Sequence, residues 1–167
     1  MVTKKRFEQG MTASEYVAQM TMNKERLLAS LQSATLAPRE AGVLERLAGT
    51  RHILVITEDW CGAAIASLPY VMKLVEGAPH VDLRIFLRDE NPDLMDQFLK
   101  DGQHRSIPVF AFFDENMNEV ARLIERPGKI TEQLEKKMLE VRRSMRAENL
   151  AQWRQDVVGE VRNLLKA

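Results

Sequence analysis

The pattern of apolar residues and turns predicts strands in four places along this chain. Four consecutive apolar residues lie within 52–57 and predict a strand buried on both faces, and five at 109–113 predict another. A third strand is predicted at 81–87, where every second residue is apolar. A turn-like segment follows 109–113, so 119–124 is predicted to pair back on it as an antiparallel hairpin.

Helical periodicity fills the intervals between the first three strands. Apolar residues about 3.6 positions apart predict a helix at 63–75, with Pro69 kinking it from inside. A short helix is predicted to begin at Asn91 and to end at Gly102. The order strand, helix, strand, helix favours an α/β sheet with parallel pairing.

Both ends of the chain are helical in pattern. Residues 11–33 carry apolar side chains at helical spacing, and Asn23 marks a break or a new N-cap within them. A further helix is predicted over 38–49. Residues 130–165 are highly charged and amphipathic, and a phase slip near 148–149 predicts either one bent helix or two. The second half of this region is expected to fold back over the N-terminal helices or to contact another chain.

The composition is that of a folded protein without an electrostatic preference for nucleic acid. The 167 residues are 45% apolar and 29% charged, which excludes a disordered chain. Basic and acidic residues number 24 each, and no basic run carries interleaved aromatics, so no nucleic-acid partner is expected. The sequence shows no signal-type segment and no apolar run long enough for a bilayer, so we expect a cytoplasmic protein without a membrane partner.

The chain has a single cysteine, Cys61, and three histidines that are far apart in sequence. One cysteine excludes an internal disulfide, a CxxC redox pair and a cysteine cluster for zinc. The histidines lack the spacing of metal ligands, and no phosphate-binding glycine motif is present. We therefore predict no metal site and no cofactor.

Cys61 follows the strand at 52–57 and an acidic turn, Glu58-Asp59, and is expected at the start of the next helix. Backbone N–H groups at a helix N-terminus, with the positive end of the helix dipole, favour the thiolate form of a cysteine. A second interpretation is that Cys61 is a small buried apolar residue, because free cysteine is among the most buried residue types. This stretch alone supports both interpretations equally.

Two motifs resemble those of the thioredoxin family. The Trp-Cys-Gly of Trp60–Gly62 is similar to the front half of the Trp-Cys-Gly-Pro-Cys active site. The Arg-Ser-Ile-Pro of Arg105–Pro108 is similar to the loop whose proline is cis in that family. The 47 residues from Cys61 to Pro108 are close to the family's usual spacing. The whole pattern is most similar to uncharacterised bacterial thioredoxin-like proteins with an N-terminal helical extension.

The resemblance implies an α/β protein with a thioredoxin-like fold. Its central sheet is expected to be mixed and four-stranded, flanked by helices, with N-terminal and C-terminal helical extensions. We expect one domain over residues 1–167, made of a helical extension at 1–49, a thioredoxin-like core at 50–140 and a C-terminal helix at 141–167.

The resemblance also implies roles for individual residues. Cys61 would be the catalytic nucleophile, with Trp60 and Gly62 beside it as substrate-binding positions. Ile107 and Pro108 would line the substrate from the facing loop. Trp60 would shield the sulfur, and a cis Pro108 would present the Ile107 backbone to an extended substrate.

The chain departs from the family at the residues that complete a dithiol cycle. Ala64 stands at the position of the second cysteine, Ala63 at that of the intervening proline, and Val55 at that of the buried acid. A dithiol enzyme releases its mixed disulfide by internal attack of the second thiol. This chain would need an external thiol for that step.

Two functions from different classes remain as hypotheses. The first is a single-cysteine thiol redox protein, whose Cys61 forms a reversible mixed disulfide with a low-molecular-weight thiol or with the disulfide of a client protein. The second is a redox-inactive binding or assembly module that uses its C-terminal helices, for example in a homodimer.

Overall fold

The computed structural model describes residues 1–38, 40, 43–46, 51–148 and 150–164. The chain divides into two compact units, Met1–Arg126 (unit 1) and Pro127–Ala167 (unit 2). The single domain expected over residues 1–167 stays a prediction.

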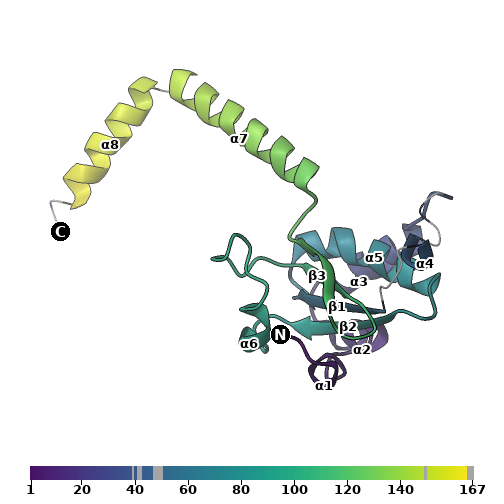
Figure 1. The fold of residues 1–167 in the computed structure, drawn as a ribbon. Helices are drawn as coiled ribbons and strands as arrows, with labels where there is room; N and C mark the ends of the chain where they lie inside the picture. The colour runs from purple at the N-terminus through teal and green to yellow at the C-terminus, as the bar shows by residue number, and fades with distance from the viewer. Residues whose placement is uncertain (39, 41–42, 47–50, 149, 165–167) are drawn as a thin grey trace. The chain divides into compact units, whose positions relative to one another are not determined.

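Unit 1 contains a four-stranded sheet in the order β2-β1-β3-β4 (Figure 1). Its strands are β1 (His52–Thr57), β2 (Asp82–Leu87), β3 (Val109–Phe113) and β4 (Glu119–Ile124). β1 pairs in parallel with β2 and antiparallel with β3, and β3 pairs antiparallel with β4. The prediction of a mixed four-stranded sheet flanked by helices is confirmed.

The helices of unit 1 are α1 (Lys4–Phe7), α2 (Ala13–Gln19), α3 (Lys24–Ser33), α4 (Val43–Arg46), α5 (Gly62–Glu76) and α6 (Pro92–Met95). The segment 11–33 forms two helices: the backbone leaves the helical conformation at Met20 (ψ 131°), and Asn23, in the left-handed conformation (φ 54°), precedes α3 as its N-cap. Thr12 begins α2 with a capping box: its hydroxyl accepts from the Glu15 N–H, and its own N–H donates to the Glu15 carboxylate at 2.7 Å. Pro69 lies inside α5, as predicted.

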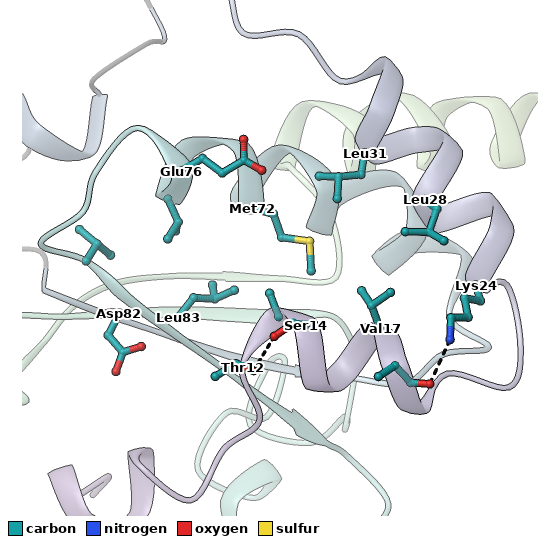
Figure 2. Close-up of a pocket in the computed structure, with 14 residues that line it drawn as sticks. Thr12, Ser14, Val17, Lys24, Leu28, Leu31, Met72, Glu76, Asp82 and Leu83 are labelled. Atoms are coloured by element: carbon teal, nitrogen blue, oxygen red, sulfur yellow. Dashed lines mark hydrogen bonds between the residues drawn. The ribbon is translucent and has the colours of Figure 1, made fainter.

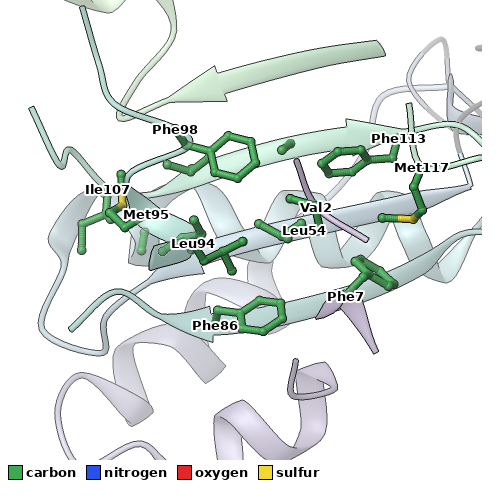
Figure 3. Packing of buried hydrophobic residues seen from close by; sticks show 14 of the residues in the cluster. Val2, Phe7, Leu54, Phe86, Leu94, Met95, Phe98, Ile107, Phe113 and Met117 are labelled. Carbon is green, nitrogen blue, oxygen red and sulfur yellow. The ribbon is translucent and has the colours of Figure 1, made fainter. Parts of the chain in front are cut away.

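Successive residues of β1 supply the two hydrophobic clusters on opposite faces of the sheet. Leu54 and Ile56 pack with residues of α1 and α6 in the cluster of Figure 3, and Ile53 and Val55 pack with residues of α2, α3 and α5. All four side chains have 0% relative exposure. The predicted strand buried on both faces is therefore confirmed, and the helices of the N-terminal extension form part of the core of unit 1.

Two predicted helices differ from the structure. The helix expected over 38–49 is described only as α4, with Pro38 in a turn before it; residues 39, 41–42 and 47–50 lie outside the described residues. The helix expected to end at Gly102 ends at Met95 instead. After it, the Gln97 and Phe98 N–H groups donate three residues back rather than four, which tightens the backbone into turns.

The N-terminal segment also pairs at one residue with the outer edge of β2, which the sequence pattern did not indicate. Met11 and Ile85 exchange two backbone hydrogen bonds of 2.9 and 2.8 Å, so Met11 forms a one-residue bridge beside β2. Gly10 makes this approach possible, because a Cβ at this position would lie 2.6 Å from the Phe86 ring and 2.8 Å from the Arg84 Cβ. The extension thus pairs with part of an edge that would otherwise be open to pairing.

Unit 2 consists of two helices, α7 (Gly128–Glu148) and α8 (Leu150–Leu164). The phase slip near 148–149 predicted either one bent helix or two helices, and the structure has two. No helix in the described part of the chain combines the length and the apolar character needed to cross a membrane.

Candidate functional site

Cys61 lies at the N-cap of α5, directly beyond the turn that follows β1. Its backbone is extended (φ −77°, ψ 107°), and its carbonyl accepts from the Ile65 N–H at 3.1 Å, which starts the helix. Its own N–H donates to the Glu58 carbonyl at 3.2 Å and closes the turn. The sulfur therefore sits at the positive end of a 15-residue helix, as predicted, with 7% of the residue exposed.

The loop before β3 faces this cysteine. The Cys61 thiol donates to the Ile107 carbonyl, with 3.6 Å between Sγ and oxygen. The Ile107–Pro108 peptide bond is cis, and β3 begins at the next residue. The structure thus brings Cys61, Ile107 and Pro108 together, although 46 residues separate the two hydrogen-bonded groups.

Trp60 and Gly62 flank the thiol without being held by core packing. The Trp60 side chain is exposed (44%), and the Arg88 guanidinium carbon lies 4.9 Å from the centre of its ring. A Cβ added at Gly62 would meet no atom within 4 Å, so sterics do not require glycine there. These two positions together form an accessible rim beside a buried sulfur.

The positions that would complete a dithiol site are filled by small apolar residues. Ala64 is fully buried in the same cluster as Cys61, and Val55 is fully buried on the opposite face of the sheet. Neither can act as a thiol or as a proton acceptor. In the part of the chain that the structure describes, no group of three or more His, Cys, Asp or Glu side chains could hold a metal ion.

Asp59 links the site to the N-terminal extension. Its carboxylate accepts from the Thr21 N–H at 2.8 Å, the Thr21 hydroxyl at 3.1 Å and the Met22 N–H at 2.9 Å. These hydrogen bonds, led by that from Met22, hold the pKa of Asp59 below its usual value. The Asn23 side-chain amide also donates to the Asp59 carbonyl at 2.9 Å. The loop between α2 and α3 therefore braces the turn that carries Trp60 and Cys61.

Glu58 lies on the inner side of the same turn. It is 8% exposed, and its carboxylate accepts from the Asp89 N–H at 2.9 Å. Burial raises the pKa of Glu58, and the hydrogen bond from Asp89 opposes this only in part. In this turn, the surroundings of Asp59 favour its charged form, whereas those of Glu58 disfavour the charged form.

Tyr16 of α2 is a buried polar residue within electrostatic reach of this turn and of Cys61. The residue has no exposed surface, and its hydroxyl has no hydrogen-bond partner among the described residues. The Thr57 hydroxyl interacts with it, but the pair falls short of hydrogen-bond geometry. Burial raises the pKa of Tyr16 to about 12, so the phenol is neutral. In the sequence, Tyr16 is one of the residues at helical spacing within 11–33, and nothing in its spacing distinguishes it from the other core positions.

The loop that carries Pro108 is anchored on both sides. Arg105 forms a two-pronged ion pair with Asp96, with both N···O distances 2.7 Å, and this pair lowers the pKa of Asp96. On the other side, the Glu125 N–H donates to the Pro108 carbonyl at 2.7 Å. These contacts hold the Ile107 carbonyl in place opposite the thiol.

A separate hollow of about 650 Å³ lies between α2, α3, the end of α5 and the start of β2 (Figure 2). Apolar side chains line most of it, including Val17, Leu31 and Leu83, and Lys24 stands at one side with its ammonium donating to the Ala18 carbonyl at 3.0 Å. None of the residues that surround Cys61 contributes to its lining. It is therefore distinct from the candidate site.

Comparisons with known proteins agree with this architecture. A family model described as thioredoxin matches residues 10–152. The chain is similar to the crystal structure of a protein of unknown function from Pseudomonas aeruginosa, with 20% identity over 87% of this chain and 90% of that one and a TM-score of 0.70. It is also similar to an HIV epitope-scaffold, with 20% identity over 78% and 81% of the two chains and a TM-score of 0.67. At such identities the similarity shows the fold alone. No curated protein matches the chain. Because the family model spans most of the sequence and the sheet is mixed and four-stranded as expected, the chain belongs to the thioredoxin family.

Proposed function

We propose that the chain is a single-cysteine thiol redox protein, in which Cys61 forms a reversible mixed disulfide with a low-molecular-weight thiol or a client protein. The observation that carries this proposal is the position of the Cys61 sulfur, at the start of α5 and 3.6 Å from the Ile107 carbonyl beside cis Pro108. A cysteine needed only to fill space in the core would not require a helix N-terminus or a braced loop opposite it.

The proposed cycle has two exchange steps. In the first, the Cys61 thiolate, having lost its proton to solvent, attacks one sulfur of an external disulfide; a Cys61–substrate disulfide forms, and the other sulfur leaves as a thiolate. In the second, an external thiolate attacks the substrate sulfur of this mixed disulfide; a disulfide forms between the two external sulfurs, and Cys61 leaves as a thiolate. The external disulfide is the oxidant and the external thiol the reductant. Ala64 is the reason that the second step needs a partner molecule.

Two groups around the sulfur suit the first step, and the Ile107 carbonyl opposes it. The Ile107 carbonyl accepts a hydrogen bond from the thiol, and that bond is lost when the proton leaves. The backbone N–H groups at the start of α5 then become the better partners for the negative sulfur. Trp60, exposed beside the sulfur, supplies an apolar surface for the incoming molecule.

A disulfide challenge of the folded protein tests this proposal. The purified chain is incubated with oxidised glutathione as the probe and analysed by mass spectrometry, before and after addition of excess thiol. We expect one adduct on Cys61 that the added thiol removes, and none on Cys61→Ser. The proposal fails if the adduct forms only in denaturant, because the sulfur is then an inert core group.

A second candidate function is a redox-inactive binding or assembly module that works through its C-terminal helices. Large exposed apolar side chains on α7, among them Met138 and Val141, favour it. This function is equally compatible with Val55 and Ala64, which stand where a dithiol enzyme has its buried acid and its second cysteine. A wild-type protein that binds a partner through α7 while Cys61 stays unreactive in the disulfide challenge would support this function over the first.

A further inference from the structure

One face of α7 is an apolar stripe. Five large apolar residues lie on it, each with between 38% and 57% of its surface exposed: Ile130, Leu134, Met138, Val141 and Met145. From Leu134 onward the intervals are four, three and four residues, which is the spacing of core positions in a two-helix coiled coil. A stripe of this kind on a charged helix marks a surface that packs against another helix.

The charges beside the stripe indicate which helix fits. Glu135 and Arg142 flank it on one side, and Lys137 lies on the other. Both Glu135 and Arg142 are exposed, and in the part of the chain that the structure describes neither takes part in an ion pair. A partner helix that places opposite charges against these two residues is therefore favoured over one that does not.

A second copy of α7 provides these opposite charges in the antiparallel direction. When Leu134 packs on Met145 of the second copy, the same register packs Met138 on Val141 of the second copy. The two-fold symmetry of the pair repeats each of these two contacts once. The same register places Glu135 opposite Arg142 of the second copy, twice. Each of the four core side chains of one chain then packs against a core side chain of the other. Each Glu135 and each Arg142 of the dimer faces a residue of opposite charge.

The parallel direction fails on charge. In a parallel pair, a residue flanking the core faces the residue five positions further along the partner helix. Lys137 would then face Arg142 of the second copy, again twice, and like charges in these positions oppose association. The charge pattern therefore selects one orientation.

We propose that α7 is a homodimerisation surface, which pairs with α7 of a second copy in antiparallel orientation through Leu134, Met138, Val141 and Met145. The pairing uses no residue of the Cys61 site and is independent of the proposed redox function. It adds a symmetric assembly in which each subunit carries its own Cys61.

Sedimentation analysis of the full chain over a range from micromolar to near-millimolar concentration tests the pairing. We expect a species of about twice the chain mass of 19.1 kDa. The double variant Met138→Glu/Val141→Glu is expected to raise the dissociation constant by at least about tenfold, since it buries charge at the centre of the contact. Leu139→Glu is the matched control, because Leu139 is equally exposed (48%) on the same helix but lies off the stripe. It should leave the dimer intact.

Charge exchange then tests the orientation. Arg142→Glu is expected to weaken an antiparallel dimer, because it faces Glu135, but would strengthen a parallel one, because it faces Lys137. Adding Glu135→Arg to that variant should restore the antiparallel dimer. A chain that stays monomeric throughout, an equal loss with Leu139→Glu, or a gain from Arg142→Glu alone would each overturn the proposal. The disulfide challenge of Cys61 is run on the same variants, and its result separates failure of the dimer from failure of the redox function.

Discussion

Replacement of Asp59 by alanine tests whether the N-terminal extension supports the Cys61 turn. The change removes a carboxylate that accepts three hydrogen bonds from Thr21 and Met22, at 2.8 to 3.1 Å. Hydrogen bonds to a charged group contribute about 1.5–3 kcal/mol each when buried. The Asp59 contacts are solvent-exposed, and water can replace the carboxylate in part, so we expect a total loss of about 1–3 kcal/mol.

Two measurements check this expectation. Urea denaturation should show the lower free energy of unfolding, and thermal unfolding should show a midpoint lower by about 2–4 °C for each kcal/mol lost in a chain of this size. Hydrogen exchange should show faster exchange of the Thr21 and Met22 amides, with little change in β3. Glu115→Ala serves as the control, since Glu115 is an exposed carboxylate in the turn after β3.

The pH dependence gives the same contact a second test. The pKa of Asp59 is lowered in the folded protein, so the unfolded state binds more protons at low pH. The stability that Asp59 contributes is therefore complete above its unfolded pKa of about 3.9 and is lost as the pH falls through the lower folded pKa. The difference between wild type and Asp59→Asn should shrink over this acidic range. Equal stability of Asp59→Ala and Glu115→Ala, with unchanged exchange at Thr21 and Met22, would refute the bracing role.

Three further substitutions probe the same unit. Burial raises the pKa of Glu58, so Glu58→Gln should increase stability at pH 7, and the gain should fade as the pH drops and the wild-type carboxyl becomes protonated; a gain of equal size at pH 4 and pH 7 would contradict this. Tyr16→Phe removes a buried hydroxyl without a partner and should change the free energy of unfolding by less than about 1 kcal/mol or raise it, whereas a larger loss would mean that the hydroxyl is bonded. Gly10→Ala should lower the free energy of unfolding by about 1–3 kcal/mol, because the added methyl group clashes with Phe86. Gly128→Ala is the control, because its added methyl group meets no atom within 4 Å. Equal melting midpoints of the two variants would argue against the close approach at Gly10.

Local sequence pattern was sufficient for the strands and for the placement of the thiol. β3 and β4 begin and end where the periodicity predicts them, and β1 is buried on both faces as its apolar run indicates. These features depend on side chains one to four positions apart, whose spacing alone decides which face of a strand or helix they occupy. For the same reason Cys61 could be placed at the start of α5 from the turn residues before it. The position of the Pro108 loop came from the resemblance of its motif, not from periodicity.

Only the tertiary structure decided what surrounds that thiol. Thr21, Met22 and Asn23 reach Asp59 across 36 to 38 positions of sequence, and Met11 reaches Ile85 across a still longer interval. Such contacts arise when separately folded segments pack against one another, and they leave no period in the sequence. The sequence therefore determined that a lone cysteine begins a helix after a buried strand. The packing of the N-terminal helices against the rest of unit 1 determined that the turn before this cysteine is held by the loop between α2 and α3.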